Sequence, residues 1–367
     1  MKVAIVSGPI EYSVCLANAL AKHCEIHFYY NERYAKQRDD MILNLLDPSI
    51  KRVPISDYRI RDFRNIAKYY RIAKNLKTFD VVHIQIADIW LAFWRFLFRK
   101  VPIVSTVHDP YQHFGLKKFN SLYQDFAQKL CIVQSTRFIV HGSKMQEDLA
   151  KRYGLLMDNI SIIPHGEFSF YKRFKSGVEW KLRKNAPYKR VLFFGLIRKN
   201  KGLKFLIKSE PLISSIFSNY KICIAGKFPD NSQFYKDFIK NSEKFEIIDE
   251  YIPIDQVSTL FEESQIVVLP YITATQSGVL PVAFAFGKPV IATNTGSISE
   301  VLEHGKNGLI VPPMNEKLLA KAILELLMDD EKCKLYGMNA KKLAAGKLNW
   351  NSIAEQTISI YRRIIKQ

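Results

Sequence analysis

The stretch VLFFGLIRKNKGLKFLIKSEPL, residues 191–212, shows how this chain is built. It begins with a continuous apolar run, passes through a short glycine-containing basic loop, and continues with the periodicity of a helix over Leu203–Leu212. A strand that leads through a short loop into a helix is the building unit of parallel sheets. The stretch therefore predicts an α/β fold.

The same alternation of short apolar runs and helical stretches recurs along nearly the whole chain. Because the strand-like runs are almost continuously apolar, we expect helices to cover both faces of each sheet. Helices are predicted over Tyr12–Lys22, Ile60–Leu76, Leu122–Gln134 and Asn351–Ile365. The predicted strands are Val3–Ser7, Glu25–Tyr29, Val81–Gln85, Ile103–Val107, Arg137–His141, Ile160–Ile163, Val191–Phe194, Lys221–Ala225, Glu246–Ile248, Ile266–Leu269, Pro289–Ala292 and Leu309–Val311.

A polar and basic segment, residues 167–188, interrupts this rhythm near the middle of the chain. A length of 367 residues also suits two α/β domains better than one. We therefore predict a first Rossmann-like domain over 1–170, a linker over 171–188 and a second Rossmann-like domain over 189–345. The remaining residues, 346–367, are expected to form a C-terminal helix.

The composition excludes several classes of protein. The apolar run Ile89–Phe98 is about half the length needed to cross a bilayer, and the first residues have no signal-peptide layout, so we expect a cytoplasmic protein. Five scattered cysteines and eight histidines show no metal-site spacing, which predicts free thiols and no metal. No nucleic-acid-binding signature is present, although the formal net charge is +19.

Two loops in the second half carry residues suited to binding an anion. Arg198 and Lys201 follow the strand and Gly195, and they could converge on a diphosphate; a solvated basic loop is the alternative. In TQSGVL, residues 275–280, a phosphate could rest on three backbone amides at a helix start. Those amides belong to Ser277, Gly278 and Val279, and the alternative is a plain helix cap by Ser277.

Loops at the carboxyl ends of first-half strands would face these two, since ligands bind there in parallel sheets. Gly8 follows the first strand and permits close approach of a ligand, but it belongs to no dinucleotide-binding fingerprint. His108 follows the fourth strand and is either a catalytic residue or a structural hydrogen-bonding residue. His165 ends the last strand of the first domain, where a hinge or capping role is expected.

Six blocks of sequence resemble the retaining glycosyltransferases of family 4, which have the GT-B fold. The blocks run in the family's order through almost the whole chain: TVHDP (106–110), VHGS (140–143), IPHGE (163–167), FGLIRKNKGL (194–203), ATQSGVLPVAFAFGKPVIAT (274–293) and GSISEVLEHGKNGLIVPP (296–313). The resemblance implies two Rossmann-like domains facing each other across a cleft. The first domain would bind the acceptor and the second the nucleotide sugar, with the C-terminal helix packing back on the first.

The resemblance also assigns expected roles to individual residues. His108, Arg198 and Lys201 are the expected catalytic residues: the two cations would bind the donor diphosphate, and His108 would contact the donor sugar. Residues expected to bind the donor are Gly8, Gly195, Tyr251, Ile252, Gln276, Ser277, Gly278 and Val279. Tyr251 and Ile252 correspond to the backbone that reads the nucleobase. Because Arg198 and Lys201 supply fixed positive charge, we expect no metal cofactor.

The chain departs from the family pattern at two positions. Ala274 and Val282 stand where the E-x7-E motif has its glutamates, which contact the donor sugar and the ribose. Either Gln276, Ser277 and backbone amides replace them in this subgroup, or the protein is catalytically weakened. We favour the first interpretation, because Arg198 and the other site residues are retained.

Basic residues gather in one part of the first half. Residues 51–100 carry 12 Lys and Arg against 4 Asp and Glu, and residues 58–77 predict an amphipathic basic helix. Such a helix can be an ordinary surface helix, or it can contact the anionic inner face of the plasma membrane. The second interpretation suits a lipid-linked acceptor.

The sequence therefore predicts a retaining, hexosyltransferase-type glycosyltransferase. It would move a sugar from a donor such as a UDP- or GDP-sugar to a glycan or lipid-linked acceptor, in bacterial surface polysaccharide biosynthesis. A nucleotide-sugar-binding subunit with weakened catalysis and a GT-B-type nucleotide-sugar epimerase are the alternatives. Nucleic acid is not an expected partner.

Overall fold

The computed structural model describes residues 1–366 except 33–39, 56–63, 112–117, 175–180 and 230–232, and for 118–124 it describes the backbone alone. The chain forms two compact units. The first comprises Met1–Gly166 and Asn349–Gln367, and the second comprises Glu167–Leu348. In the described part of the chain, no helix combines the length and the apolar character needed to span a membrane.

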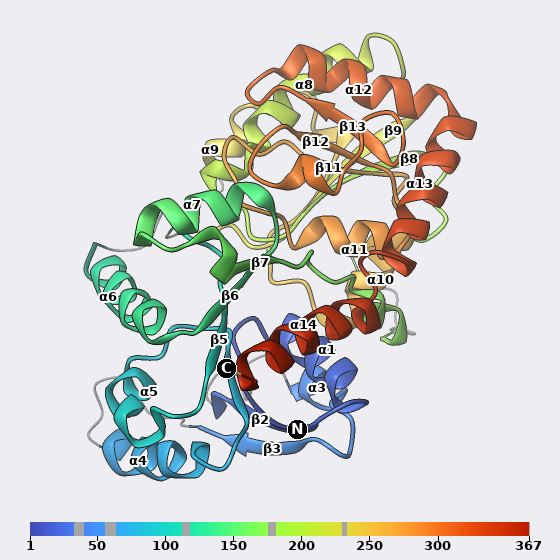
Figure 1. Ribbon diagram of the computed structural model, residues 1–367. Coiled ribbons are helices and arrows are strands. Elements are labelled where there is room, and N and C mark those ends of the chain that lie inside the picture. Colours follow the sequence, from blue (N-terminus) through green and yellow to red (C-terminus); the bar gives the residue numbers. More distant parts are fainter. Residues whose placement is uncertain (33–39, 56–63, 112–117, 175–180, 230–232, 367) are drawn as a thin grey trace. The chain divides into compact units, whose positions relative to one another are not determined.

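The first unit contains a parallel sheet whose seven described strands have the order β3-β2-β1-β4-β5-β6-β7 (Figure 1). From β1 the chain builds outward to β2 and β3, then crosses to the other side of β1 and continues through β4 to β7. The order therefore reverses between β1 and β4. The strands are β1 (Lys2–Val6), β2 (Glu25–Tyr30), β3 (Lys51–Pro54), β4 (Val81–Ile84), β5 (Ile103–Thr106), β6 (Arg137–Val140) and β7 (Ile160–Ile162).

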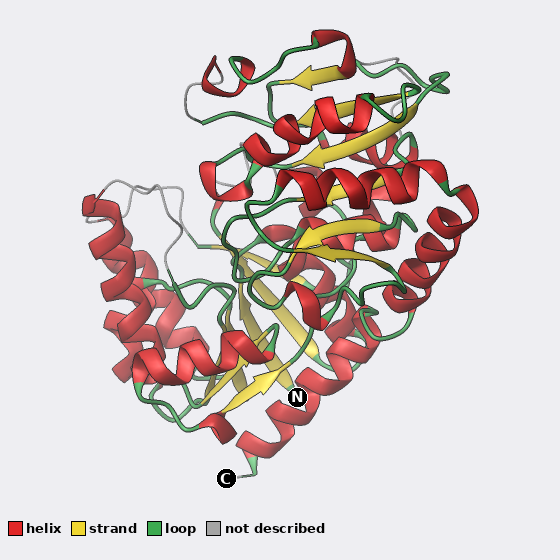
Figure 2. Ribbon diagram, turned by 90° about the horizontal axis from the view of Figure 1, so that it is seen from above, coloured by secondary structure: helices red, strands yellow, loops and turns green. Residues whose placement is uncertain are grey.

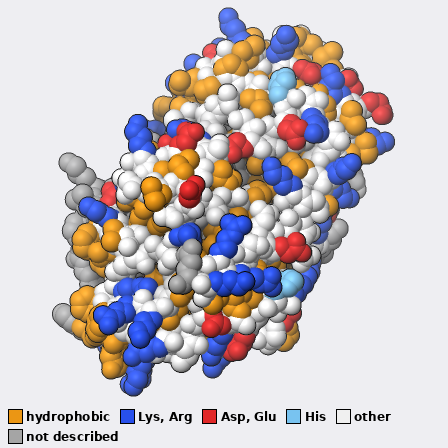
Figure 3. All heavy atoms as spheres, viewed as in Figure 1, with side chains coloured by type: hydrophobic (Ala, Val, Ile, Leu, Met, Phe, Trp, Pro, Cys, Tyr) orange, Lys and Arg blue, Asp and Glu red, His pale blue; other side chains and the backbone are white. Residues whose placement is uncertain are grey.

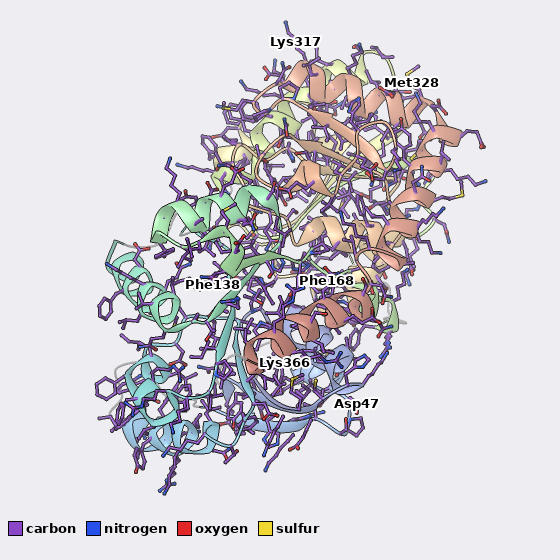
Figure 4. The ribbon with its side chains drawn as sticks, in the orientation of Figure 1. Asp47, Phe138, Phe168, Lys317, Met328 and Lys366 are labelled. Atoms are coloured by element: carbon purple, nitrogen blue, oxygen red, sulfur yellow. The ribbon has the colours of Figure 1, made fainter. Side chains whose placement is uncertain are left out.

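Helices cover both faces of this sheet, as Figures 1 and 2 show. Helix α14, from the end of the chain, packs on α1 within this unit. Phe138 on β6, labelled in Figure 4, is buried with residues of α6 and α7. The helices are α1 (Ile10–Ala21), α3 (Asp40–Leu43), α4 (Arg64–Leu76), α5 (Ile89–Phe93), the 3-10 helix η2 (Trp94–Phe98), α6 (Lys118–Gln134), α7 (Ser143–Tyr153), η3 (Met157–Asn159) and α14 (Trp350–Ile365).

The second unit has a parallel sheet with the order β10-β9-β8-β11-β12-β13 among its described strands, and here the order reverses between β8 and β11. Its strands are β8 (Lys189–Phe194), β9 (Tyr220–Ala225), β10 (Phe245–Ile248), β11 (Ile266–Leu269), β12 (Val290–Thr293) and β13 (Gly308–Val311). Its helices are α8 (Leu203–Ser214), α9 (Gln233–Lys236), α10 (Ile254–Glu262), α11 (Val279–Ala285), α12 (Glu316–Met328) and α13 (Asp330–Ala345). Short 3-10 helices are η4 (Ser169–Arg173), η5 (Lys199–Lys201), η6 (Ser242–Lys244) and η7 (Ile298–Glu300).

The prediction of an α/β fold with two Rossmann-like parallel sheets is confirmed, and every predicted strand is present within two residues of its expected bounds. Strand β3 was not predicted. Its sequence, KRVP, lies at the edge of the sheet with mostly exposed side chains, so it lacks the apolar run of a central strand. The start of the helix predicted from Ile60 lies outside the described residues up to position 63.

The predicted linker is not a free connection where it is described. The carbonyl oxygen of Phe174 accepts a hydrogen bond from Ser258 Oγ at 3.2 Å, and Leu182 is buried. Lys172 donates to the carbonyl oxygen of Ala285. The described residues of 171–188 therefore pack within the second unit, because their apolar side chains and polar groups find partners there. Residues 175–180 lie outside the described part.

Candidate functional site

The loop after β8 and the loop after β11 lie side by side in the second unit, where the strand order of the sheet reverses. The backbone N–H of Ile272 donates to the carbonyl oxygen of Asn200 at 2.8 Å. Gly202 has a φ of +69°, and a Cβ there would lie 1.8 Å from the carbonyl oxygen of Pro270. Glycine is therefore required at position 202 so that the two loops can meet.

These two loops carry the residues predicted to hold a diphosphate. Lys201 Nζ lies 3.9 Å from the ring centroid of Tyr271, a cation–π contact. The hydroxyl of Tyr271 is 3.1 Å from Ser277 Oγ, so the buried tyrosine connects the basic loop to the start of α11. Arg198, which is partly exposed, precedes η5 in the same loop. Crevices at such reversal points are where open parallel sheets bind ligands.

The start of α11 differs in one respect from a plain helix cap by Ser277. Gly278 occupies the N-cap position without a side-chain hydrogen bond, and Ser277 Oγ accepts from the N–H of Val279 at 3.3 Å. One of the three amides proposed for a phosphate therefore already has a weak partner. Gly278 is exposed, Gln276 is partly exposed, and a Cβ on Gly195 would be 3.6 Å from the Val279 side chain.

The two positions that lack the family's glutamates have different surroundings. The backbone of Ala274 packs closely against the loop after β12, because a Cβ on Gly296 would lie 2.1 Å from the Ala274 carbonyl oxygen. Val282, on α11, is 3% exposed. Neither side chain can hydrogen-bond a sugar or a ribose.

Tyr251 and Ile252 lie at the same edge of the sheet but farther from these loops. They follow β10, which β9 separates from β8. Tyr251 is 55% exposed and Ile252 is partly exposed. The structure therefore places both residues beyond the carboxyl ends of the strands, two strands away from Gly195.

In the first unit, Gly8 occupies the point where the strand order reverses between β1 and β4. A Cβ at this position would lie 2.2 Å from the carbonyl oxygen of Gln85, which follows β4. The N–H of Gly8 donates to Ser13 Oγ at 3.1 Å, and that hydroxyl is 2.5 Å from Gln85 Oε1. Gly8 thus allows two loops to approach each other closely.

Three histidines follow three neighbouring strands of the first sheet. His108 comes after β5, His141 after β6 and His165 after β7. His108 Nδ1 is 3.1 Å from His141 Nε2, and His141 Nδ1 is 3.0 Å from the carbonyl oxygen of Ile163. The ring of Tyr12, from α1, lies within 5.2 Å of all three imidazole centroids.

Burial keeps these histidines uncharged at neutral pH. It lowers the pKa of His141 to about 3 and that of His165 to about 4. Burial, reinforced by the neighbouring histidines, also lowers the pKa of His108 well below its ordinary value. The cluster therefore cannot supply a positive charge to a diphosphate at pH 7.

The hydrogen bonds fix which nitrogen of His108 carries its proton. A carbonyl oxygen can only accept, so His141 Nδ1, bonded to Ile163, must carry the proton of that neutral ring. His141 Nε2 is then an acceptor, and His108 must donate to it from Nδ1. His108 Nε2 consequently bears a lone pair and can act only as a hydrogen-bond acceptor.

A fourth buried histidine, His83, supports the strand that leads to His108. His83 on β4 lies between Thr106 Oγ1 on β5, at 2.7 Å, and the hydroxyl of Tyr361 on α14, at 2.5 Å. Thr106 also hydrogen-bonds with Tyr12. The C-terminal helix is therefore connected through hydrogen bonds to the strand end that carries His108.

Models of two glycosyltransferase families match this chain, one in each unit. The model described as Glycosyltransferase Family 4 matches residues 8–166, and the model described as Glycosyl transferases group 1 matches residues 188–329. The chain belongs to the GT-B-type glycosyltransferases.

Known proteins similar to this glycosyltransferase are distant in sequence. An uncharacterized glycosyltransferase of Methanocaldococcus jannaschii is 23% identical over 72% of this chain and 70% of its own length. A sucrose-phosphate synthase from Thermosynechococcus elongatus superposes with a TM-score of 0.75 at 18% identity, covering 100% of this chain and 99% of its own. The Anabaena protein HepE in complex with UDP and glucose gives a TM-score of 0.75 at 16% identity, covering 99% and 100%. These structures have the same GT-B fold.

Sequence reasoning did not single out three residues that contact the candidate site residues of their own unit. His141 stands at the end of a predicted strand, as His108 does, and that shared position was a usable signal. Tyr12 and Tyr271 lie in ordinary apolar surroundings in the sequence, and only the fold brings them to the histidines and to Lys201. Among the residues that the structure describes, no cluster of His, Cys, Asp or Glu could hold a metal ion.

Proposed function

We propose that this glycosyltransferase transfers a hexose from a nucleoside diphosphate sugar to a glycan or lipid-linked acceptor, with retention of configuration. The observation that supports this proposal is the basic loop after β8, where Lys201 lies on Tyr271 and Tyr271 contacts Ser277. A diphosphate held there would place its negative charge beside Arg198, Lys201 and the amides near Gly278.

The proposed chemistry is stabilisation of the leaving group. As the bond between sugar and diphosphate breaks, negative charge grows on the diphosphate, and fixed cations lower the barrier most where that charge develops. The acceptor would attack the face from which the nucleoside diphosphate departs. Because Arg198 and Lys201 carry permanent charge, we propose that no metal ion is needed.

His108 has a different proposed role. Its Nε2 lone pair would accept a hydrogen bond from a hydroxyl of the donor sugar. Gln276 and Ser277 would supply the polar contacts that the glutamates at positions 274 and 282 supply elsewhere in family 4. The nucleobase would lie near Tyr251 and Ile252, and Gly8 and Gly195 would allow the backbone to approach the donor.

We place the reaction in the cytoplasm, at the inner face of the plasma membrane, during synthesis of a bacterial surface polysaccharide. The support is the basic segment around α4, combined with an acceptor that would be lipid-linked. The Anabaena protein HepE binds UDP in its solved complexes, so uridine donors are the first to test.

Substitution of the two basic residues tests the proposal directly. Arg198→Ala and Lys201→Ala should each reduce transfer by about 100-fold or more, since each removes charge stabilisation from the leaving group. Lys199→Ala is the matched control, because this exposed lysine lies in the same loop. Activity would be measured with a panel of UDP- and GDP-sugars, with thermal stabilisation by UDP and GDP as a separate binding measurement.

The outcomes separate the alternatives. Full activity in either alanine variant would refute the assigned site. Thermal stabilisation by a nucleotide without transfer or hydrolysis would indicate a binding subunit, and interconversion of the donor sugar would indicate an epimerase.

A further inference from the structure

One surface of the first unit combines exposed aromatic and basic side chains. Phe93 and Phe96, on α5 and η2, are 64% and 61% exposed, and on α4 Tyr70 is 42% and Ile66 41% exposed. Trp94 joins the aromatic residues, with ring centroids 5.1 Å from Phe93, 5.7 Å from Phe96 and 5.3 Å from Tyr70. Together with five basic residues these side chains form what we call the α4–η2 surface; the basic residues are Lys68, Arg71, Lys74, Arg99 and Lys100.

The described elements that form this surface, α4, α5 and η2, carry no acidic side chain. Residues 64–77 and 89–100 contain eight Lys and Arg and no Asp or Glu. Within the described part of the chain, none of the five basic residues of the surface forms an ion pair. Figure 3 shows basic and hydrophobic side chains gathered where Figure 1 draws α4 and α5.

Asp88, which precedes α5, is a described carboxylate that contacts both α4 and α5. Asp88 accepts hydrogen bonds from the hydroxyl of Tyr69 at 2.7 Å and from the N–H groups of Trp90 and Leu91 at 2.9 and 3.1 Å. It therefore caps α5 and fastens it to α4. Burial also raises the pKa of Asp88. The carboxylate serves to build the surface and does not neutralise it.

One arginine likewise holds the aromatic segment in shape. Arg95 donates to the carbonyl oxygens of Arg99 at 3.1 Å and Val101 at 2.9 Å, so its guanidinium closes the end of η2. Phe93 and Phe96 are thus presented on a short, fastened segment. Two large apolar side chains exposed beside unpaired cations indicate a surface that a partner covers.

We propose that the α4–η2 surface docks on an anionic lipid bilayer, with Phe93, Phe96 and Ile66 entering the boundary between headgroups and acyl chains. The basic residues would contact the anionic headgroups, which attract each Lys or Arg close to the membrane surface. Tyr70 and Trp94 have the amphipathic rings that favour this boundary. The proposed docking surface thus includes, besides the basic helix α4, the aromatic segment formed by α5 and η2.

Charge argues for lipid over a second copy of the chain. A two-fold dimer would place the same surface of two molecules face to face and bring their unpaired cations together. Phe and Ile side chains, which have no polar atom, gain most in a hydrocarbon environment. The docking proposal rests on the proposed function in one respect: the purpose of docking would be access to a lipid-linked acceptor.

Vesicle co-sedimentation of the full chain tests the docking without any sugar donor. We expect binding to phosphatidylglycerol vesicles at low salt, weak binding to phosphatidylcholine vesicles, and loss at high salt. Phe93→Ser combined with Phe96→Ser should weaken binding by about tenfold or more. Leu156→Ser combined with Met157→Ser is the control, because these side chains are 73% and 43% exposed at the start of η3 in the same unit.

The charged residues have their own matched pair of variants. Lys68→Gln, Arg71→Gln and Lys74→Gln together should also weaken binding by about tenfold or more. Lys317→Gln, Lys321→Gln and Lys334→Gln together, on α12 and α13 of the second unit, should leave it unchanged; Figure 4 labels Lys317. Circular dichroism would verify that each variant is folded.

Several outcomes would overturn the proposal. The first is that the wild type does not bind phosphatidylglycerol vesicles at low salt. The second is that the Phe93→Ser, Phe96→Ser double variant binds these vesicles as tightly as the wild type does. Binding to single-stranded RNA that is tighter than binding to vesicles, and that the serine and glutamine variants lose, would assign the surface to nucleic acid. A dimer that dissociates in the serine variant without vesicles would assign it to a second copy. Transfer activity without vesicle binding would refute docking alone, and vesicle binding without transfer would refute the proposed function alone.

Discussion

At the scale of single residues, contacts within the first unit determine which ring nitrogen of His108 donates a hydrogen bond and which one accepts. Two rings and one carbonyl group form a directed series: His108 Nδ1 donates to His141 Nε2, and His141 Nδ1 donates to Ile163. The direction is set at the carbonyl oxygen, which can only accept. His141 is thus a positioning residue, and the remaining ring nitrogen of His108, the buried Nε2, is a hydrogen-bond acceptor.

Replacing His141 should change the proton position on His108. In His141→Leu the acceptor is lost, and we expect His108 Nε2 to become protonated in a large share of molecules. In His141→Gln the side-chain oxygen can still accept from His108 Nδ1, so the wild-type tautomer should persist. Nitrogen-15 NMR of labelled histidines distinguishes the two tautomers in the protein without substrate.

The same variants make a kinetic prediction. His141→Leu should lower kcat/KM by about tenfold, the value of one hydrogen bond, whereas His141→Gln should stay near the wild type. A leucine variant that keeps the wild-type nitrogen spectrum would contradict the directed series, whatever its activity.

A second residue-scale prediction concerns Gly202. Alanine there would require a strained φ and would place Cβ 1.8 Å from the Pro270 carbonyl oxygen, so Gly202→Ala should destabilise the protein by more than about 2 kcal/mol. Gly278→Ala is the control, because its φ is −71° and no atom lies within 4 Å of the added Cβ. Urea denaturation measures both, and equal stabilities would refute the close loop contact.

At the scale of secondary-structure elements, α14 is held to the first sheet by a polar contact as well as by packing. Tyr361 on this helix reaches His83 on β4, and His83 reaches Thr106 on β5. Each of these side chains is buried. A buried hydrogen bond whose partner is removed leaves an unsatisfied group, which is costly.

Tyr361→Phe should therefore destabilise the protein by about 2 kcal/mol, because the phenyl ring retains the packing but leaves His83 Nδ1 without its partner. Ser359→Ala on the same helix, where the side chain is exposed, should change the free energy of unfolding by less than about 0.5 kcal/mol. Chemical denaturation monitored by circular dichroism compares the two. A tyrosine variant as stable as the wild type would mean that packing alone holds α14.

At the scale of the whole molecule, buried neutral histidines make stability depend on pH. Burial lowers the pKa of His83 and of His141 to about 3, and that of His165 to about 4, all below the unfolded value near 6.5. Below pH 6.5 the unfolded chain binds protons that the folded chain cannot, so acid favours unfolding. This stability is fully present above pH 6.5 and is lost as the pH falls toward 3–4.

We expect the free energy of unfolding to fall between pH 7 and pH 5, by up to about 2 kcal/mol for each buried histidine. In His83→Gln the fall should be smaller by about that amount. His23→Gln is the control, since His23 is exposed. Urea denaturation at several pH values measures the slope, and a stability that rises toward pH 5 would contradict neutral burial.

Much of the fold could be predicted from the sequence because local patterns carry it. Apolar strands such as Ile266–Leu269 are continuous, and glycine and basic residues mark the loops after them. Strand β3 was not predicted, because an edge strand needs no apolar run. The candidate anion-binding loop was predicted for a related reason: Arg198 and Lys201 are three residues apart, so their proximity is a local property.

The sequence by itself determined two Rossmann-like sheets and their described strands except β3. It also determined that Gly8 and His108 follow strands of the first sheet, and Arg198 and Lys201 a strand of the second. Only the tertiary structure decided how Tyr271 joins Lys201 to Ser277, and how His141 sets the proton of His108. It also decided that Asp88 points inward beneath an aromatic and basic surface. The physical reason is the separation along the chain. Strand and loop patterns depend on neighbouring residues, whereas these hydrogen bonds and the cation–π contact depend on ångström distances between residues far apart in the sequence.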